Sequence, residues 1–290
     1  MSWDFELVAG PFDFTEGPAW DGDAVLFTDI PNNHIMRYNP SSGECTEFRT
    51  GTNEANGLMF NKAGELYACE GGSGGRRMVR YNPDGTTDVL ADSFEGKRLN
   101  SPNDLAFDAQ GRIWFTDPRY GEKFDDMELG HESVFRLDPQ GDGTWGINRI
   151  THDTTKPNGL LISPDQKWLY VAQSHYGDNK RELRGYPIND DGTVGEYEVL
   201  HNFFPHRGID GMCLDTEGNI VATAGWKQSG PGPMIYVFAP NGRVLETHPI
   251  PNDQPTNCTF GDADLQTLYV TAGGCLYRTR TERKGHLIYP

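Results

Sequence analysis

One pattern recurs six times along the 290 residues of the chain, and this repetition limits the possible folds more than any other feature. Each copy begins with a polar residue, which we call its anchor. A small residue, a short apolar run, a turn of Asp, Asn and Gly, and a second β-rich run follow. A third run often ends in Tyr-Asn-Pro or a variant of it. The anchors are Glu16, Asn56, Asn103, Asn158, Asp210 and Asn257.

The spacing of the anchors predicts a β-propeller. Successive anchors lie 40, 47, 55, 52 and 47 residues apart, which suits four-stranded antiparallel blades with loops of variable length. No segment keeps an apolar stripe of helical period over three turns, so we expect almost no helix. A β-sandwich of regular hairpins would not reuse the same anchor and closing phrase. We therefore predict an all-β fold, a single six-bladed propeller domain spanning residues 1–290.

The two ends of the chain should help to close the ring. A β-rich run at residues 5–8 precedes the first anchor, and another at residues 285–288 follows the sixth copy. One of them should form the outer strand of the last blade, because pairing the ends removes an open sheet edge. The sequence does not decide between them.

Charge and composition limit the possible partners. The chain has 42 acidic residues against 25 Lys and Arg, a net charge of −17, which opposes binding to nucleic acid or to an anionic membrane. We see no membrane-spanning apolar run and no secretory signal pattern. Five cysteines without CxxC spacing do not suggest a disulfide framework. We expect a cytoplasmic protein, a monomer or small homo-oligomer, that acts on a small molecule.

The anchors are candidate ligands for a metal ion. The first strand of a propeller blade lines the central channel, so equivalent anchors should converge at one mouth of it. Their carboxylate and amide oxygens are typical of a hard-cation site such as one for Ca²⁺.

Turn capping is the alternative role for any single anchor, since Asn and Asp commonly cap turns before Gly. We assign a structural or supporting role to Asn56 and Asn257. Glu16 is not a favoured turn former, and an unpaired Asp210 carboxylate facing a channel would be costly without a cation. Glu16 and Asp210 are therefore the two favoured ligand candidates, and the remaining anchors stay unranked.

Four motifs, in this order and on this period, give the whole chain a family resemblance. They are Glu-Gly-Pro-Ala-Trp at 16–20, Asn-Ser-Pro-Asn-Asp at 100–104 with Phe-Thr-Asp at 115–117, Lys-Pro-Asn-Gly-Leu at 156–160, and Ile-Asp-Gly at 209–211. With them the chain resembles the SMP-30/gluconolactonase/LRE family. The resemblance implies one divalent cation, most often Ca²⁺, with Mg²⁺, Mn²⁺ or Zn²⁺ as other candidates. Its implied ligands are Glu16, Asn103, Asn158 and Asp210.

The resemblance also implies a hydrolase that opens the ring of a small lactone, such as a gluconolactone or another aldonolactone. Asp210 would be the catalytic base or nucleophile, and Asn103 and Asn158 would orient the substrate oxygen. Asp210 as a cation ligand only is the alternative mechanism. Two other functions stay open: hydrolysis of a phosphotriester or fluorophosphate, as in the related diisopropyl fluorophosphatase, and a non-catalytic calcium-binding or interaction propeller.

Loops between the second and third strands should surround the site, because the second strand returns to the mouth at which the first strand begins. These are residues 117–133, 173–183 and 225–233, and long loops over one mouth commonly carry binding residues. Asp117 also has a structural interpretation, because its Phe-Thr-Asp phrase recurs at residues 27–29. The substrate-binding candidates are Asn103, Asp117, Arg119, Tyr120, His175 and Trp226, with Tyr176 also within reach.

Overall fold

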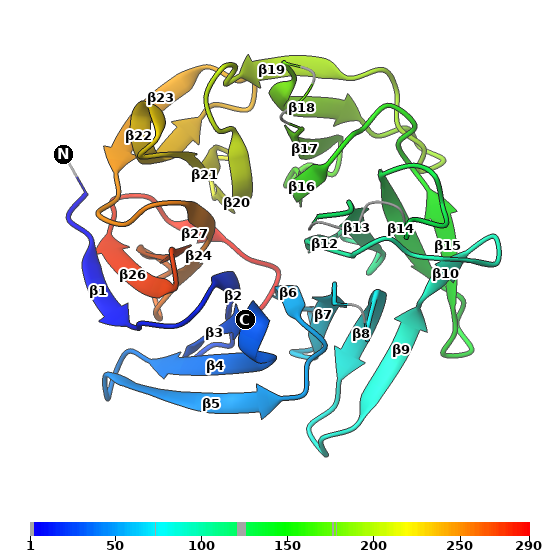
Figure 1. The fold of residues 1–290 in the computed structure, drawn as a ribbon, viewed down its shortest axis with the longest axis horizontal. Helices are drawn as coiled ribbons and strands as arrows, with labels where there is room; N and C mark the ends of the chain where they lie inside the picture. Colours follow the sequence, from blue (N-terminus) through cyan, green and yellow to red (C-terminus); the bar gives the residue numbers. More distant parts are fainter. Residues whose placement is uncertain (1–2, 73, 121–125, 176, 178) are drawn as a thin grey trace.

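A computed structural model describes residues 3–72, 74–120, 126–175, 177 and 179–290. In this part of the chain, six antiparallel sheets stand in a ring around a central axis (Figure 1), which confirms the predicted propeller. The only helix among these residues is the 3₁₀ turn η1 (Ile30–Asn32). No helix there is long and apolar enough to cross a membrane.

We number the blades by their anchors, from the inner strand outwards. Blade 1 contains β2 (Thr15–Trp20), β3 (Val25–Asp29), β4 (His34–Asn39) and β5 (Glu44–Thr50). Blade 2 contains β6 (Ala55–Phe60), β7 (Leu66–Glu70), β8 (Arg77–Tyr81) and β9 (Thr87–Ala91). Blade 3 contains β12 (Leu105–Phe107), β13 (Ile113–Asp117), β14 (Ser133–Pro139) and β15 (Trp145–Arg149). A short hairpin of β10 (Ser93–Phe94) and β11 (Lys97–Arg98) connects blades 2 and 3.

The second half of the ring repeats this arrangement. Blade 4 contains β16 (Pro157–Ile162), β17 (Trp168–Ser174), β18 (Arg181–Pro187) and β19 (Glu198–Asn202). Blade 5 contains β20 (Ile209–Asp215), β21 (Ile220–Trp226), β22 (Ser229–Phe238) and β23 (Val244–Pro249). Blade 6 contains β24 (Pro255–Gly261), β25 (Thr267–Ala272), β26 (Cys275–Arg280) and β1 (Glu6–Ala9).

The core is divided among the interfaces between blades. Six clusters of buried apolar side chains each join two neighbouring sheets, because every sheet buries both faces of its inner and second strands. All five residues of β3, for example, are buried. The residues of the outer strands are mostly exposed or partly buried, as in β5, where all except Cys45 and Arg49 are exposed. Burial therefore increases towards the axis, where the inner strands meet.

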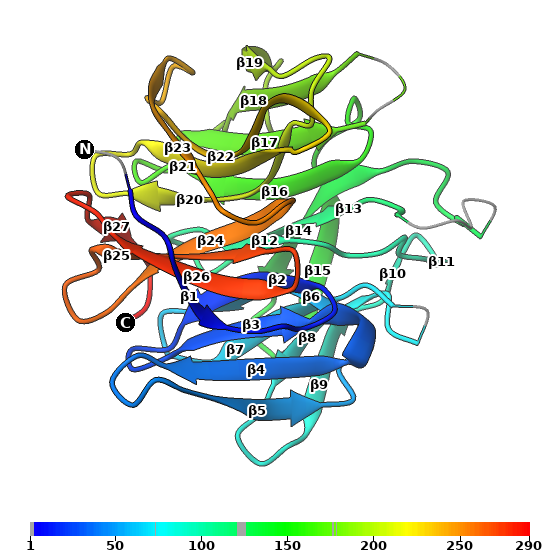
Figure 2. The same cartoon turned by 60° about the vertical axis from the view of Figure 1, so that its left-hand side comes forward.

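The N-terminal strand closes the ring. β1 pairs with β26 through Glu6 and Leu7, opposite Arg278 and Tyr277, as the outer strand of blade 6 (Figure 2). The C-terminal run at residues 285–288 does not join blade 6.

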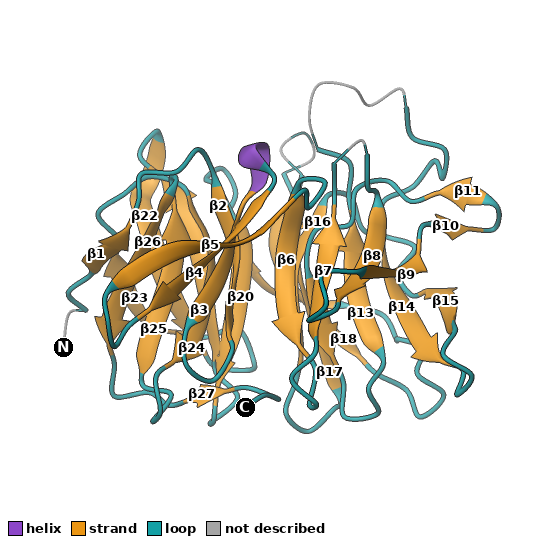
Figure 3. Cartoon of the chain, turned by 90° about the horizontal axis from the view of Figure 1, so that it is seen from below, coloured by secondary structure: helices purple, strands orange, loops and turns teal. Residues whose placement is uncertain are grey.

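β27 (Gly285–His286) pairs with the inner strand β20 at Leu214 and Asp215, the end that lies away from the anchor. Figure 3 shows β27 and the C-terminus on the face opposite η1. Residues 286–289 line a cavity of about 110 Å³ there with residues of all six inner strands. The axial channel is thus covered at one end by the tail, and the anchors lie at its other end.

Candidate metal centre

The anchors occupy equivalent places in the fold. Four of them are the second residues of β2, β6, β16 and β20, Asn257 is the third residue of β24, and Asn103 lies just before β12. In five blades the pairing of the inner and second strands shifts register at or beside the anchor. Such a bulge turns a side chain away from the regular pleat. The same irregularity thus recurs at the anchors of five blades.

Hydrogen bonds between blades fix the heights of the inner strands relative to one another. The backbone N–H of Gly57 donates to Asn103 O at 2.8 Å, which links blades 2 and 3. Hydroxyl groups link four further pairs of neighbouring blades in the same way. Their donors and acceptors are Thr28 to Asn56 O, Ser174 to Ile209 O, Thr223 to Thr256 O, and Thr256 to Thr15 O.

Close approach of the inner strands explains the glycines after the anchors. A Cβ atom at Gly159 would lie 2.5 Å from Asp210 O, and one at Gly211 would lie 2.0 Å from the side-chain carbon of Asn257. Real side chains do not tolerate such contacts, so Gly is required where these strands cross. The anchors of neighbouring blades are therefore packed against one another.

Asp210 is held at both of its carboxylate oxygens. Asn158 Nδ2 donates to Asp210 Oδ1 at 2.6 Å and to the Tyr120 hydroxyl at 3.1 Å. The Arg207 guanidinium donates to Asp210 Oδ2 in a salt bridge. Arg207 is itself fixed by Gly225 O at 3.1 Å and Pro255 O at 3.0 Å. The carboxylate is consequently oriented by three segments of blades 4 to 6.

A further carboxylate, Asp104, lies at the axis. Asn257 Nδ2 of blade 6 donates to Asp104 Oδ2 of blade 3 at 3.3 Å, although these two blades stand opposite each other in the ring. The channel is therefore narrow enough for opposite walls to touch. Asp104 was not among the predicted site residues; its signal in the sequence is an acidic residue in the place that Gly fills after four other anchors.

The electrostatics of the three axial carboxylates share one cause, which is burial. Burial and then the Asp210 charge raise the pKa of Glu16 well above its usual range, and Asp104 raises it further. Burial raises the pKa of Asp104 to about 7. Burial also raises the pKa of Asp210, although Arg207 and Asn158 act in the opposite direction. The Arg207 guanidinium thus hydrogen-bonds to one of the three groups, Asp210, and the raised pKa values show that ionising all three together would require a further positive charge.

The four predicted ligands are not equally connected in the structure. Glu16 and Asp210 interact electrostatically, and Asn158 contacts Asp210 directly. Asn103 is buried, and its backbone joins the same ring through Gly57. The described residues contain no group of three or more His, Cys, Asp and Glu side chains placed to hold a metal. Any cation here would therefore need the amide oxygens of the anchors.

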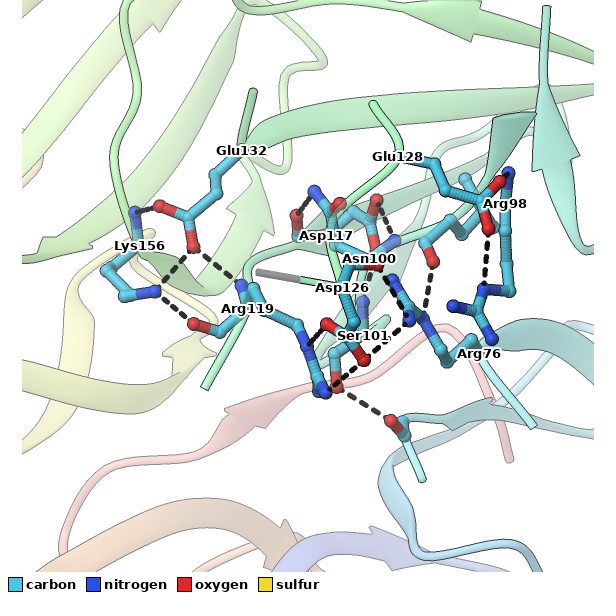
Figure 4. Close-up of polar contacts among 12 residues, drawn as sticks. Arg76, Arg98, Asn100, Ser101, Asp117, Arg119, Asp126, Glu128, Glu132 and Lys156 are labelled. Carbon is cyan, nitrogen blue, oxygen red and sulfur yellow. Dashed lines mark hydrogen bonds and ion pairs between the residues drawn. The ribbon is translucent and has the colours of Figure 1, made fainter. Parts of the chain in front are cut away.

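Asp117 has a structural role in this arrangement (Figure 4). Its side chain is fully buried, and its two oxygens accept hydrogen bonds from the backbone N–H groups of Asn100 and Ser101 at 2.9 and 2.8 Å. Asp29 and Gln173 likewise accept from the backbone before their own inner strands. The carboxylate of Asp117 therefore holds the entry into β12, and a role in substrate binding stays a prediction.

The other predicted substrate-binding residues differ in whether they contact the anchors. Tyr120 contacts it through Asn158, whereas the Arg119 guanidinium forms two hydrogen bonds with Asp126 in the cluster of Figure 4. His175 accepts a hydrogen bond from Gly177, and the Trp226 indole donates to Ser229. Tyr176 lies outside the described residues.

Known proteins match this chain over nearly its whole length. Residues 14–274 match the model of a protein family that is described as the SMP-30/Gluconolactonase/LRE-like region. A gluconolactonase of Zymomonas mobilis is 32% identical, over 98% of this chain and 83% of that relative. A 6-deoxy-6-sulfogluconolactonase of Pseudomonas putida is 26% identical, over 96% and 95% of the two chains. The solved structure of a Xanthomonas campestris gluconolactonase has a TM-score of 0.82 and 32% identity, covering 96% of this chain and 89% of that one.

Proposed function

This chain belongs to the SMP-30/gluconolactonase/LRE-like family, and we propose that it hydrolyses the ring ester of a small lactone with the help of a divalent cation. Its relatives from Zymomonas mobilis and Xanthomonas campestris are named gluconolactonases, and the one from Pseudomonas putida is named a 6-deoxy-6-sulfogluconolactonase. An aldonolactone is therefore the substrate class that we propose.

The observation that carries the proposal is the charge balance at the axis. Glu16 and Asp104 are buried, Asp210 is partly buried, and Arg207 hydrogen-bonds to Asp210. When all three carboxyl groups are ionised, a divalent cation would neutralise the two charges that Arg207 does not balance. Buried charges are stable only when they are paired in this way.

The donor set also fits a hard cation. Glu16 and Asp210 offer carboxylate oxygens, and Asn103 and Asn158 offer amide oxygens, which Ca²⁺ prefers. Asn158 uses its amide nitrogen for Tyr120 and Asp210, so its amide oxygen is available as a ligand. We therefore propose these four residues as the ligands, with Ca²⁺ as the first candidate metal and Mg²⁺, Mn²⁺ and Zn²⁺ as alternatives. When bound, the cation would polarise the lactone carbonyl as a Lewis acid.

Asp210 is the residue that we propose as general base or nucleophile. Its Oδ2 is held by Arg207 and its Oδ1 by Asn158, so the carboxylate keeps one orientation. A positioned base of this kind typically contributes about 10²–10⁴-fold to rate. The Tyr120 hydroxyl, next to Asn158, is the neighbouring group that can hydrogen-bond to a substrate hydroxyl.

The test is a proton-release assay over a panel of aldonolactones. The protein is assayed as purified, after thorough chelation, and after Ca²⁺, Mg²⁺, Mn²⁺ or Zn²⁺ is restored separately. We expect ring opening of at least one aldonolactone, its loss on chelation, and recovery with one of the metals. No turnover of any lactone would contradict the function, and turnover unaffected by chelation would contradict the role of the cation.

A further inference from the structure

A second cavity lies on the rim of the propeller, away from the axial site. It has a volume of about 420 Å³, within the usual range of small-molecule sites. Its walls come from the β10–β11 hairpin, from β15, and from the segments that flank β14 and β15. Figure 1 shows β10 and β15 together at the outer edge of blade 3.

Four basic side chains line this cavity against a single acidic one. Lys97, His131, Arg149 and His152 face Glu95. This concentration is unusual for a chain of net charge −17. The groups also influence one another, because burial and then Arg149, His152 and Lys97 lower the pKa of His131. Lys97 and Arg149 therefore give the cavity two positive charges against the one carboxylate of Glu95, with two imidazoles beside them.

Arg149 differs from most other arginines in the described part of the chain. Those of blades 2 and 3, for example, pair with carboxylates: Arg76 with Asp126, Arg98 with Glu128, and Arg136 with Asp138. Arg149 uses only its Nε atom, which donates to Ser133 Oγ at 2.9 Å and to Thr151 O at 3.1 Å. Among the described contacts, its two terminal nitrogens have no protein partner.

The hydrogen bonds beneath the cavity offer a second donor. A guanidinium can only donate, so Ser133 Oγ accepts from Arg149 and can donate its own proton to His131 Nδ1, 3.2 Å away. In that tautomer the neutral imidazole carries its proton on Nε2, where it can donate to a ligand. Asn100 Nδ2 donates to the His131 carbonyl at 2.6 Å and holds that residue in place. Ser133 is fully buried, so this arrangement is part of the folded core.

We propose that this cavity binds a small phosphomonoester. The Arg149 terminal nitrogens, the Lys97 ammonium and the two imidazoles offer donors from several directions, as a tetrahedral dianion requires. Phe94, Leu129 and Ile147 form an apolar wall beside them, suited to the organic part of the ligand. The proposal is independent of lactone hydrolysis, because none of these residues belongs to the axial group.

Calorimetry on the full-length chain tests the proposal, with inorganic phosphate, phenyl phosphate, benzoate and phenol as probes. We expect inorganic phosphate to bind and phenyl phosphate to bind about tenfold more tightly, since the ring can bury apolar surface against the wall. Phenol should not bind, because it lacks the anion. Benzoate binding as tight as that of phenyl phosphate would overturn the assignment to phosphate.

Substitutions in the cavity test whether phosphate binds there. Arg149→Gln should abolish phosphate binding, but it also removes contacts to Ser133 and Thr151. Lys97→Gln and His152→Gln change exposed side chains, and each should weaken binding several-fold while the thermal transition and lactone hydrolysis stay unchanged. Arg243→Gln, an exposed arginine of blade 5, is the matched control. No binding of either phosphate at millimolar concentration, or equal binding by all variants, would overturn the proposal.

Discussion

Asn158 Nδ2 lies 2.6 Å from Asp210 Oδ1, so the anchors of blades 4 and 5 are in direct contact at the axis of the propeller. The contact orients both groups. The amide nitrogen is turned towards a carboxylate, and the amide oxygen is left for another positive partner. Turn capping, the alternative role of the anchors, does not require side chains from two different blades to be in contact.

Replacing Asp210 with Asn should abolish most hydrolysis without unfolding the protein. The amide keeps the shape of the carboxylate but cannot accept a proton or attack a carbonyl. We expect kcat to fall by about 100-fold or more, the contribution of a positioned base. Initial rates of proton release measure the effect, with Asp190→Asn in an exposed hairpin as the control. Retention of most activity would exclude Asp210 as base or nucleophile.

Arg207 should act as a positioning residue for Asp210. A lysine cannot reach Asp210, Gly225 O and Pro255 O at once, as the guanidinium does. Arg207→Lys should therefore lower kcat by about tenfold, and Arg207→Met should do so more strongly, because a misplaced catalytic group of this kind costs up to about 100-fold. Separate determination of kcat and KM, with a melting curve for each variant, checks the effect. A wild-type kcat in Arg207→Met would contradict it.

Asp104 should make the chelated protein less stable as the pH rises. Burial raises its pKa in the folded protein to about 7, whereas an unfolded Asp titrates near 4. A raised folded pKa gives stability that is fully present below the unfolded pKa and is lost as the pH rises through the folded value. Asp104→Asn removes this loss, so the variant should gain stability relative to the wild type between pH 5 and pH 7.5, by about 1 kcal/mol or more.

Urea unfolding of both proteins in chelator measures this difference. The lowered pKa values of His131 and His201 act in the opposite direction over part of this interval. Both proteins contain these histidines, so their contribution cancels in the comparison. A stability difference that is constant or that shrinks with pH would contradict the assignment.

The repeat was sufficient to predict the propeller, because the anchor residues recur along the sequence at the spacing of propeller blades. Glycines and amides recur where neighbouring inner strands lie very close together. At Gly159 and Gly211, for example, there is no room for a side chain. The loop from Asp117 to Ser133 also has the predicted limits, since β13 ends and β14 begins at these residues. The strand that closes the ring could not be chosen, because both terminal runs have the composition of a strand.

Contacts across the axis could not be predicted in the same way. The bond from Asn257 to Asp104 depends on the width of the channel, which no local pattern encodes. The same holds for Arg207, whose side chain reaches blade 6 at Pro255 O. Asp117 was open to two interpretations, and its backbone partners, which lie 16 and 17 residues earlier, are evident only once the chain is folded.

Calcium binding to the chelated protein tests the central claim most directly, because it does not depend on knowing the substrate. Isothermal titration with Ca²⁺ should give one site per chain, and Glu16→Gln should weaken it by about 100-fold or more, since it removes one of two charged ligands. Glu196→Gln, an exposed residue of blade 4, should bind like the wild type. Absence of binding for Ca²⁺ and for each alternative metal, or equal affinity in Glu16→Gln, would contradict a cation site built from the anchors.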